Sequence, residues 1–174
     1  APPSECLVRM GERLTRRFYG SIRRGAATHD NLLSMADSIL VSLDGTRHDA
    51  DAPFLHADDL AAVRGDGIFE TLLVRGGRAR CVRLHLERLA RSAAAMELDK
   101  PDLDEWRAVI ETATQAWTEK HGSSGEALLR LVYSRGREHG SAPTAYVTVD
   151  AVPDRVSAAR ADGVRVVTLA RGFS

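Results

Sequence analysis

The chain has 174 residues, a length that suits one domain, or one domain with part of a second. Its 24 basic and 24 acidic side chains cancel, which gives no support for a nucleic-acid or anionic-membrane partner, because both attract a basic surplus. No apolar run approaches the ~20 residues of a membrane span, and two cysteines do not make a disulfide framework, which favours a reducing, cytoplasmic location.

Residues 1–34 differ from the rest of the chain. They are rich in arginine and poor in acids, and they show no strand pattern. A leader of this composition could be an organelle transit peptide. The alternative is an extension, disordered or upstream of the true start, with Met35 as the natural first residue. We expect the extension, because a regular pattern begins directly after Met35.

Apolar runs between turn signals then predict strands. Ser38–Leu43 is one strand, and Asp44-Gly45 marks a hairpin turn after it. The acidic stretch 48–60 contains Pro53 and is interpreted as a loop.

A second predicted hairpin pairs Ile68–Val74 with Arg78–Val82 across Gly76-Gly77. Cys81 falls within the apolar second strand of this hairpin. We therefore expect it to be a buried thiol.

Two helices follow in the predicted order. The first spans 84–98, where an apolar residue recurs every three or four positions. Asp102 begins the second as its N-cap, and this helix runs to the Gly-Ser loop at 122–125. Their apolar stripes are Leu86, Leu89, Ala93 and Met96 in the first helix, and Leu103, Trp106, Val109, Ile110, Ala113 and Trp117 in the second.

Strands are predicted again at 128–133 and 145–149. The order indicates an α+β fold, an antiparallel sheet with two helices on one face. We expect a small domain over 35–151, an interdomain linker at 152–163, and the start of a larger domain at 164–174. Val164–Leu169 is predicted to be the first strand of that larger domain.

The first candidate for ligand chemistry lies in the predicted helix. His85 and Arg88 are three residues apart and share a helix face. Arg88 borders the apolar stripe, where an unpaired charge is costly, so it needs an anionic partner. A phosphate would suit its planar guanidinium, and so would a surface pair with Glu87 or Glu97.

Arg130 stands in the middle of the apolar run 128–133. A charge there is usually paired or functional, and a pocket for a substrate carboxylate is one explanation. The other is a strand with one solvent-facing side, on which Arg130 points outward with its neighbours. Arg135, Arg137 and His139 share the next loop, where they could cap a pocket for an acidic ligand or form a solvated cluster offset by Glu138.

Other chemistries find less support. Gly65-Asp66-Gly67 precedes a strand, which is the wrong context for a phosphate-binding loop. The histidines and cysteines lack metal-ligand spacing, and no nucleophile-elbow signature is present.

The order and spacing of three motifs nevertheless resemble those of the class IV aminotransferases, the pyridoxal-phosphate (PLP) enzymes of fold type IV. These motifs are 64–72 (RGDGIFETL), 85–89 (HLERL) and 129–136 (LRLVYSRG). The stretch 163–168 is similar to the first strand of the larger domain of these enzymes. Within the family, the chain is most similar to actinobacterial 4-amino-4-deoxychorismate lyases.

Departures from related enzymes favour that lyase. Thr71 stands where branched-chain aminotransferases have glycine, and Leu128 stands where they carry a carboxylate-binding tyrosine. Arg64 stands at a position where branched-chain and D-amino-acid aminotransferases tend to have other residues. The alternatives are a branched-chain or D-amino-acid aminotransferase, or a catalytically inactive small-domain module.

The resemblance implies PLP as cofactor, a homodimer, and a small amino or carboxylate substrate. It implies that Arg88 holds the cofactor phosphate. It also implies that the substrate pocket is lined by Arg64, Phe69, Thr71, Arg130 and Arg137. The lyase reaction releases pyruvate and forms 4-aminobenzoate for folate synthesis.

The Schiff-base lysine of the family has no counterpart here. Lys100 and Lys120 are the only lysines, and both are predicted to be exposed and away from the family position. We expect the lysine beyond Ser174, in the part of such an enzyme that a C-terminally truncated chain would lack.

Overall fold

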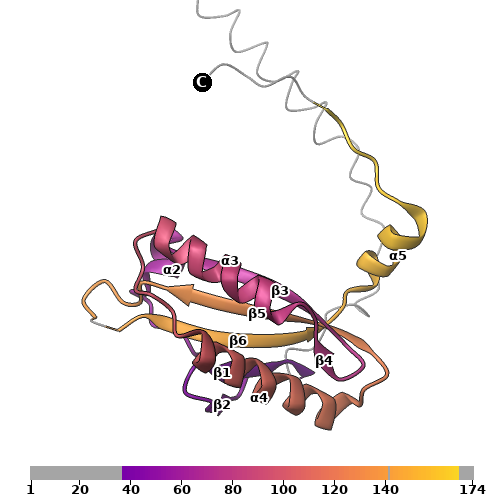
Figure 1. Ribbon diagram of the computed structural model, residues 1–174, viewed down its shortest axis with the longest axis horizontal. Helices are drawn as coiled ribbons and strands as arrows, with labels where there is room; N and C mark the ends of the chain where they lie inside the picture. Colours follow the sequence, from indigo (N-terminus) through magenta and orange to yellow (C-terminus); the bar gives the residue numbers. More distant parts are fainter. Residues whose placement is uncertain (1–36, 141, 169–174) are drawn as a thin grey trace, which may run out of the picture. The chain divides into compact units, whose positions relative to one another are not determined.

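A computed structural model describes residues 37–140 and 142–168 (Figure 1). Its elements are β1 Ile39–Ser42, β2 Arg47–His48, α2 Leu60–Arg64, β3 Gly67–Arg75, β4 Arg78–Ala79, α3 Val82–Ala95, α4 Leu103–His121, β5 Glu126–Ser134, β6 Thr144–Ala151 and α5 Asp154–Asp162. The expected extension at 1–34 lies outside the described residues.

Six strands form one sheet in the order β2-β1-β6-β5-β3-β4, and every neighbouring pair is antiparallel. Helix α3 packs on β3, and α4 packs on β1 and β6 (Figure 1). The side chains of both helices enter the same hydrophobic core, so both cover one face of the sheet. The predicted α+β fold, with two helices on one face of an antiparallel sheet, is confirmed.

The core lies between that sheet face and the two helices. Trp106 and Ile110 of α4 are at most 2% exposed, and Leu86 and Leu89 of α3 are at most 1% exposed. Asp102 caps α4 as predicted, because its carboxylate accepts hydrogen bonds from the amides of Asp104 and Glu105. The predicted α4 stripe is buried except for Leu103, which is partly buried against the core.

Strand alternation leaves the second sheet face uncovered by these helices. In β5, Leu129 and Leu131 are fully buried against the helices, whereas Leu128 and Val132 are partly exposed and Arg130 is exposed. We call this second surface the open face. It includes the outward side chains of β3, β5 and β6.

Both predicted hairpins form. Gly45 has a φ of 86° in the β1–β2 turn, and Gly76 and Gly77 have φ values of 62° and 68° in the β3–β4 turn. In the β3–β4 hairpin, Arg75 pairs with Arg78, and a two-residue turn of this kind requires positive φ at both of its central residues.

The structure corrects the second strand of that hairpin. It ends at Ala79, so Cys81 lies in the turn before α3, with a φ of 55°, and its thiol is exposed rather than buried. The predicted stripe of α3 also needs one change. Met96 is 40% exposed beyond the end of the helix, and Leu98 is buried instead.

Two segments gain helices that the sequence interpretation lacked. Residues 60–64 form the short helix α2, which begins at the last residue of the predicted loop 48–60 and is capped by Asp59 and Gly65. Asp154–Asp162, in the predicted linker, forms α5, which has no buried residue. Arg160 of α5 pairs with Glu126 at 2.6 Å.

Residues 164–168 of the predicted strand Val164–Leu169 form no strand, and residue 169 lies outside the described range. Val164, Val166 and Val167 are 72–83% exposed. A strand needs a partner for its backbone hydrogen bonds, and no described residue pairs with this segment. No helix in the described part of the chain is long and apolar enough to cross a membrane.

Candidate active site

The open face brings together three of the predicted pocket residues. Thr71 of β3 lies directly opposite Arg130 of β5, and Phe69 lies opposite Val132. The Phe69 side chain is 68% exposed, and the Arg130 guanidinium carbon is 5.9 Å from the centroid of its ring. Contact of this kind between a cation and an aromatic ring is favourable and holds the two side chains near each other.

A cavity of about 450 Å³ lies beside this pair. It is lined by Ala61, Gly65, Gly67, Ile68, Phe69, Arg130 and Val132. Arg130 is the only ionisable residue in that lining, so the cavity combines apolar walls with a single cation. This composition suits a small molecule with an apolar body and a carboxylate.

Arg88 lies apart from this cavity, on the helix-covered side. Its Nε donates to Oε1 of Glu70 at 2.6 Å, and its Nη2 donates to Oε2 at 2.5 Å. His85 lies 2.9 Å from the same Oε2 through Nδ1. The counter-charge of Arg88 is therefore Glu70, rather than Glu87 or Glu97.

Glu70 is the buried partner of this cluster, with 4% of its side chain exposed against 58% for Arg88. Burial raises the pKa of the Glu70 carboxyl, but hydrogen bonds from Arg88 and His85 outweigh it and hold the pKa below its usual 4.5. The carboxylate therefore stays ionised, and the guanidinium extends from it toward solvent.

Arg64 and Arg137 lie near one end of the sheet, each in an ion pair. Arg64 pairs with Glu138 at 2.6 Å and Arg137 with Asp58 at 2.9 Å. Neither lines the cavity beside Arg130. Of the predicted pocket residues, the structure thus gathers Phe69, Thr71 and Arg130 and leaves these two in separate pairs.

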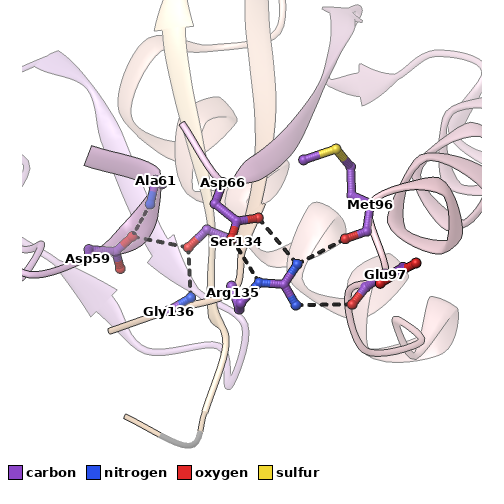
Figure 2. A network of polar contacts seen from close by, with 8 residues as sticks. All are labelled: Asp59, Ala61, Asp66, Met96, Glu97, Ser134, Arg135 and Gly136. Carbon is purple, nitrogen blue, oxygen red and sulfur yellow. Dashed lines mark hydrogen bonds and ion pairs between the residues drawn. The ribbon is translucent and has the colours of Figure 1, made fainter. Parts of the chain in front are cut away.

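Sequence reasoning missed a polar network that holds this end of the sheet together (Figure 2). Asp59 is 1% exposed, and its carboxylate accepts hydrogen bonds from the Ala61 amide and from the hydroxyls of Ser134 and Thr144. This ties the start of α2 to β5 and β6. The N-cap preference of aspartate was the one signal in the sequence for its role.

Arg135 was predicted as a cation of this loop, but its place in the network was missed (Figure 2). Its guanidinium binds the carboxylate of Asp66 at 2.8 Å and the carbonyls of Met96 and Glu97 at 2.9 and 3.0 Å. It therefore joins the turn before β3 to the end of α3. Arg137 and Glu138 of the same predicted loop also form ion pairs, with Asp58 and Arg64.

Both lysines are exposed, as predicted. Lys120, near the end of α4, pairs with Asp37 at 3.8 Å. Neither lysine lines the cavity beside Arg130.

Comparison with known proteins identifies the class. Residues 67–172 match the model of the amino-transferase class IV family. Since this is more than half of the chain, the chain belongs to that family, as its motifs predicted.

Two relatives from Mycobacterium tuberculosis are especially similar. The bifunctional aminodeoxychorismate lyase / D-amino acid transaminase is 59% identical over 135 residues, which are 78% of this chain and 46% of that protein. A hypothetical aminotransferase, solved in its PLP-bound form, is 58% identical with a TM-score of 0.69, and the match covers 72% of this chain and 44% of that one. The chain thus spans less than half the length of these relatives.

A more distant structure has the same fold. A fold IV transaminase from Curtobacterium pusillum is 32% identical with a TM-score of 0.66, over 68% of this chain and 44% of that one.

Proposed function

We propose that this chain provides the small domain, and one wall of the active site, of a PLP-dependent enzyme. Membership of the class IV family and the likeness to a PLP-bound structure support this. The domain boundaries that accompany the proposal are a small domain over 35–151, a linker at 152–163 and a larger domain that begins at 164.

Arg88 has a guanidinium edge that could donate to the cofactor phosphate. Glu70 engages Nε and Nη2, and among the described residues no hydrogen bond reaches Nη1. A 58% exposed guanidinium with a free edge can donate to a phosphate oxygen while its other edge stays paired. Arg88 is therefore the residue of this chain that would hold the phosphate.

The open face would form the substrate side. When bound, PLP supplies an electron sink for the substrate carbon next to nitrogen. Arg130 would bind a substrate carboxylate, and the exposed Phe69 ring would pack on its apolar part. Thr71 and Leu128 would border this position, since Thr71 lies opposite Arg130 and Leu128 lies two residues before it on β5.

We propose the lyase reaction as the principal activity, in which 4-amino-4-deoxychorismate yields pyruvate and 4-aminobenzoate for folate synthesis. The observation that carries this is the 59% identity to a protein named as an aminodeoxychorismate lyase. The apolar cavity with one arginine is compatible with a cyclic carboxylate substrate. A cytoplasmic homodimer is part of the same proposal.

A second candidate is D-amino acid transamination. The same relative carries that activity in its name, and a related structure from the same organism holds alpha-ketoglutarate and PMP. A branched-chain aminotransferase is less favoured, because Leu128 replaces the tyrosine expected in that branch.

The activities separate in one assay on the protein expressed from its complete reading frame. Aminodeoxychorismate without any amino acceptor should release pyruvate and 4-aminobenzoate in equal amounts. D-alanine and a branched-chain L-amino acid, each with 2-oxoglutarate, test the two transaminase alternatives. Absence of pyruvate from the first reaction would refute the lyase proposal, and inactivity in all three, together with no PLP absorbance, would favour an inactive binding module.

A further inference from the structure

The cluster of Glu70, His85 and Arg88 has a feature that phosphate binding by Arg88 alone leaves unexplained. Glu70 is 4% exposed, yet it accepts three hydrogen bonds, two from Arg88 and one from His85. Placing a carboxylate in the covered side of a sheet is costly unless its acceptors are used. Here the hydrogen bonds from Arg88 and His85 of α3 offset this cost, and they hold both side chains in place.

The geometry determines the plane of the Arg88 guanidinium. Two parallel bonds to one carboxylate leave an arginine little rotational freedom, whereas a single bond or a bare charge does not. Arg88 is otherwise an exposed side chain that would sample many rotamers. Glu70 therefore restricts the rotamers of Arg88 before any ligand binds, so that this entropy cost is not incurred on binding.

His85 supports the same arrangement from the adjacent turn of α3. Its Nδ1 is 2.9 Å from Oε2 of Glu70, the oxygen that also accepts from Nη2 of Arg88. The carboxylate is thus held from two positions on one helix. A shift of Glu70 along β3 would break bonds to both.

We propose that Glu70 is a positioning residue for phosphate recognition: it acts through Arg88, with His85 in support, and fixes the free guanidinium edge for the cofactor phosphate. This inference rests on the proposed function. It adds the requirement that the Arg88 guanidinium be oriented as well as charged. Charge alone would not explain a role for Glu70 in phosphate binding, since Glu70 is an anion and would by itself repel a phosphate.

Glu70→Asp tests this, because it keeps the charge but withdraws the carboxylate by one methylene, so that both bonds to Arg88 cannot be kept in place. In the protein expressed from its complete reading frame, we expect this change to raise the dissociation constant for PLP about tenfold. The dissociation constant for pyridoxal, which lacks the phosphate, should stay within about twofold. Glu87→Asp is the matched control, because Glu87 precedes Arg88 on α3 and pairs with Arg83 on the exposed surface.

A double-mutant cycle separates positioning from a merely structural role. Arg88→Lys keeps the charge but removes the planar fork, so adding Glu70→Asp to it should weaken PLP binding no further. NMR of the Arg88 Nε–H group gives a readout without cofactor, since its restricted motion should be lost in Glu70→Asp. If Glu70→Asp fails to fold, His85→Gln removes one support of Glu70 and should weaken PLP binding in the same selective way.

Wild-type PLP affinity in Glu70→Asp, an equal loss for PLP and pyridoxal, or an additive loss in the double mutant would each overturn the proposal. Wild-type PLP affinity in Arg88→Lys would overturn it as well, because the planar fork would then not be needed. Failure of the proposed function looks different, because the unmodified protein would then bind no PLP.

Discussion

Phe69 and Glu70 are adjacent in sequence and face opposite sides of the sheet. The Phe69 side chain is 68% exposed on the open face, beside Arg130, whereas Glu70 is 4% exposed beneath α3, where it binds Arg88. Strand alternation therefore lets one motif serve two purposes. Its odd positions contribute to the proposed substrate wall, and Glu70 organises the proposed phosphate contact.

Replacement of Arg88 by alanine should weaken PLP binding by about 10- to 150-fold, since a hydrogen bond between charged groups contributes about 1.5–3 kcal/mol. Titration of the apoprotein with PLP, followed by absorbance, measures this. Arg91→Ala is the control, because Arg91 is an exposed arginine on the same helix. Unchanged PLP affinity in Arg88→Ala would remove Arg88 from its assigned role.

Replacement of Arg130 by methionine should raise the KM for a carboxylate substrate by about tenfold or more, because the cavity would lose its only cation. Methionine keeps much of the side-chain volume and the contact with Phe69. Steady-state kinetics on the active protein measure the change, with Arg78→Met on β4 as the control. An equal change in both variants would show that the effect is not specific to the cavity.

The sheet and the two long helices were predictable because their patterns are local. The β3 and β5 runs are bounded by glycine turns or polar loops, and α4 has both a cap at Asp102 and a regular apolar stripe. Short elements escaped prediction. A five-residue helix such as α2 has too few positions to show a period, and its stability comes from Asp59, Gly65 and contacts to the β5–β6 loop.

The predicted site was incomplete for a different reason. Alternation along β3 could have placed Phe69 and Thr71 on one face and Glu70 on the other. The pairing of Glu70 with Arg88 depends on how α3 packs over β3, which no local pattern specifies. The pairs Arg64–Glu138 and Arg137–Asp58 likewise join residues 74 and 79 positions apart.

Gly67 should be intolerant of a side chain. A Cβ there would lie 2.9 Å from the Ser134 Cβ and 3.0 Å from the Tyr133 carbonyl oxygen, at the first residue of β3. We expect Gly67→Ala to lower the free energy of unfolding by about 1–3 kcal/mol in urea titrations.

Gly125→Ala is the matched control for that change, because a Cβ at Gly125 meets nothing within 4 Å and its φ is not positive. It should be neutral or stabilising by up to about 1 kcal/mol. Equal stability of the two variants would show that β3 can shift away from β5 at this point without cost.

The pairing of Glu70 should make stability depend on pH in the acid range. Its folded-state pKa lies below the ordinary 4.5, so the unfolded chain binds more protons between those two values. The stabilisation is fully present above pH 4.5 and is lost as the pH falls through the folded-state pKa. Glu70→Gln should therefore lower the free energy of unfolding at pH 7 by about 1–3 kcal/mol and flatten its decline below pH 4.5. Urea titrations between pH 2.5 and 7 measure both effects, with Glu87→Gln as the control, and an acid decline as steep in Glu70→Gln as in the unmodified protein would show that Glu70 contributes nothing to it.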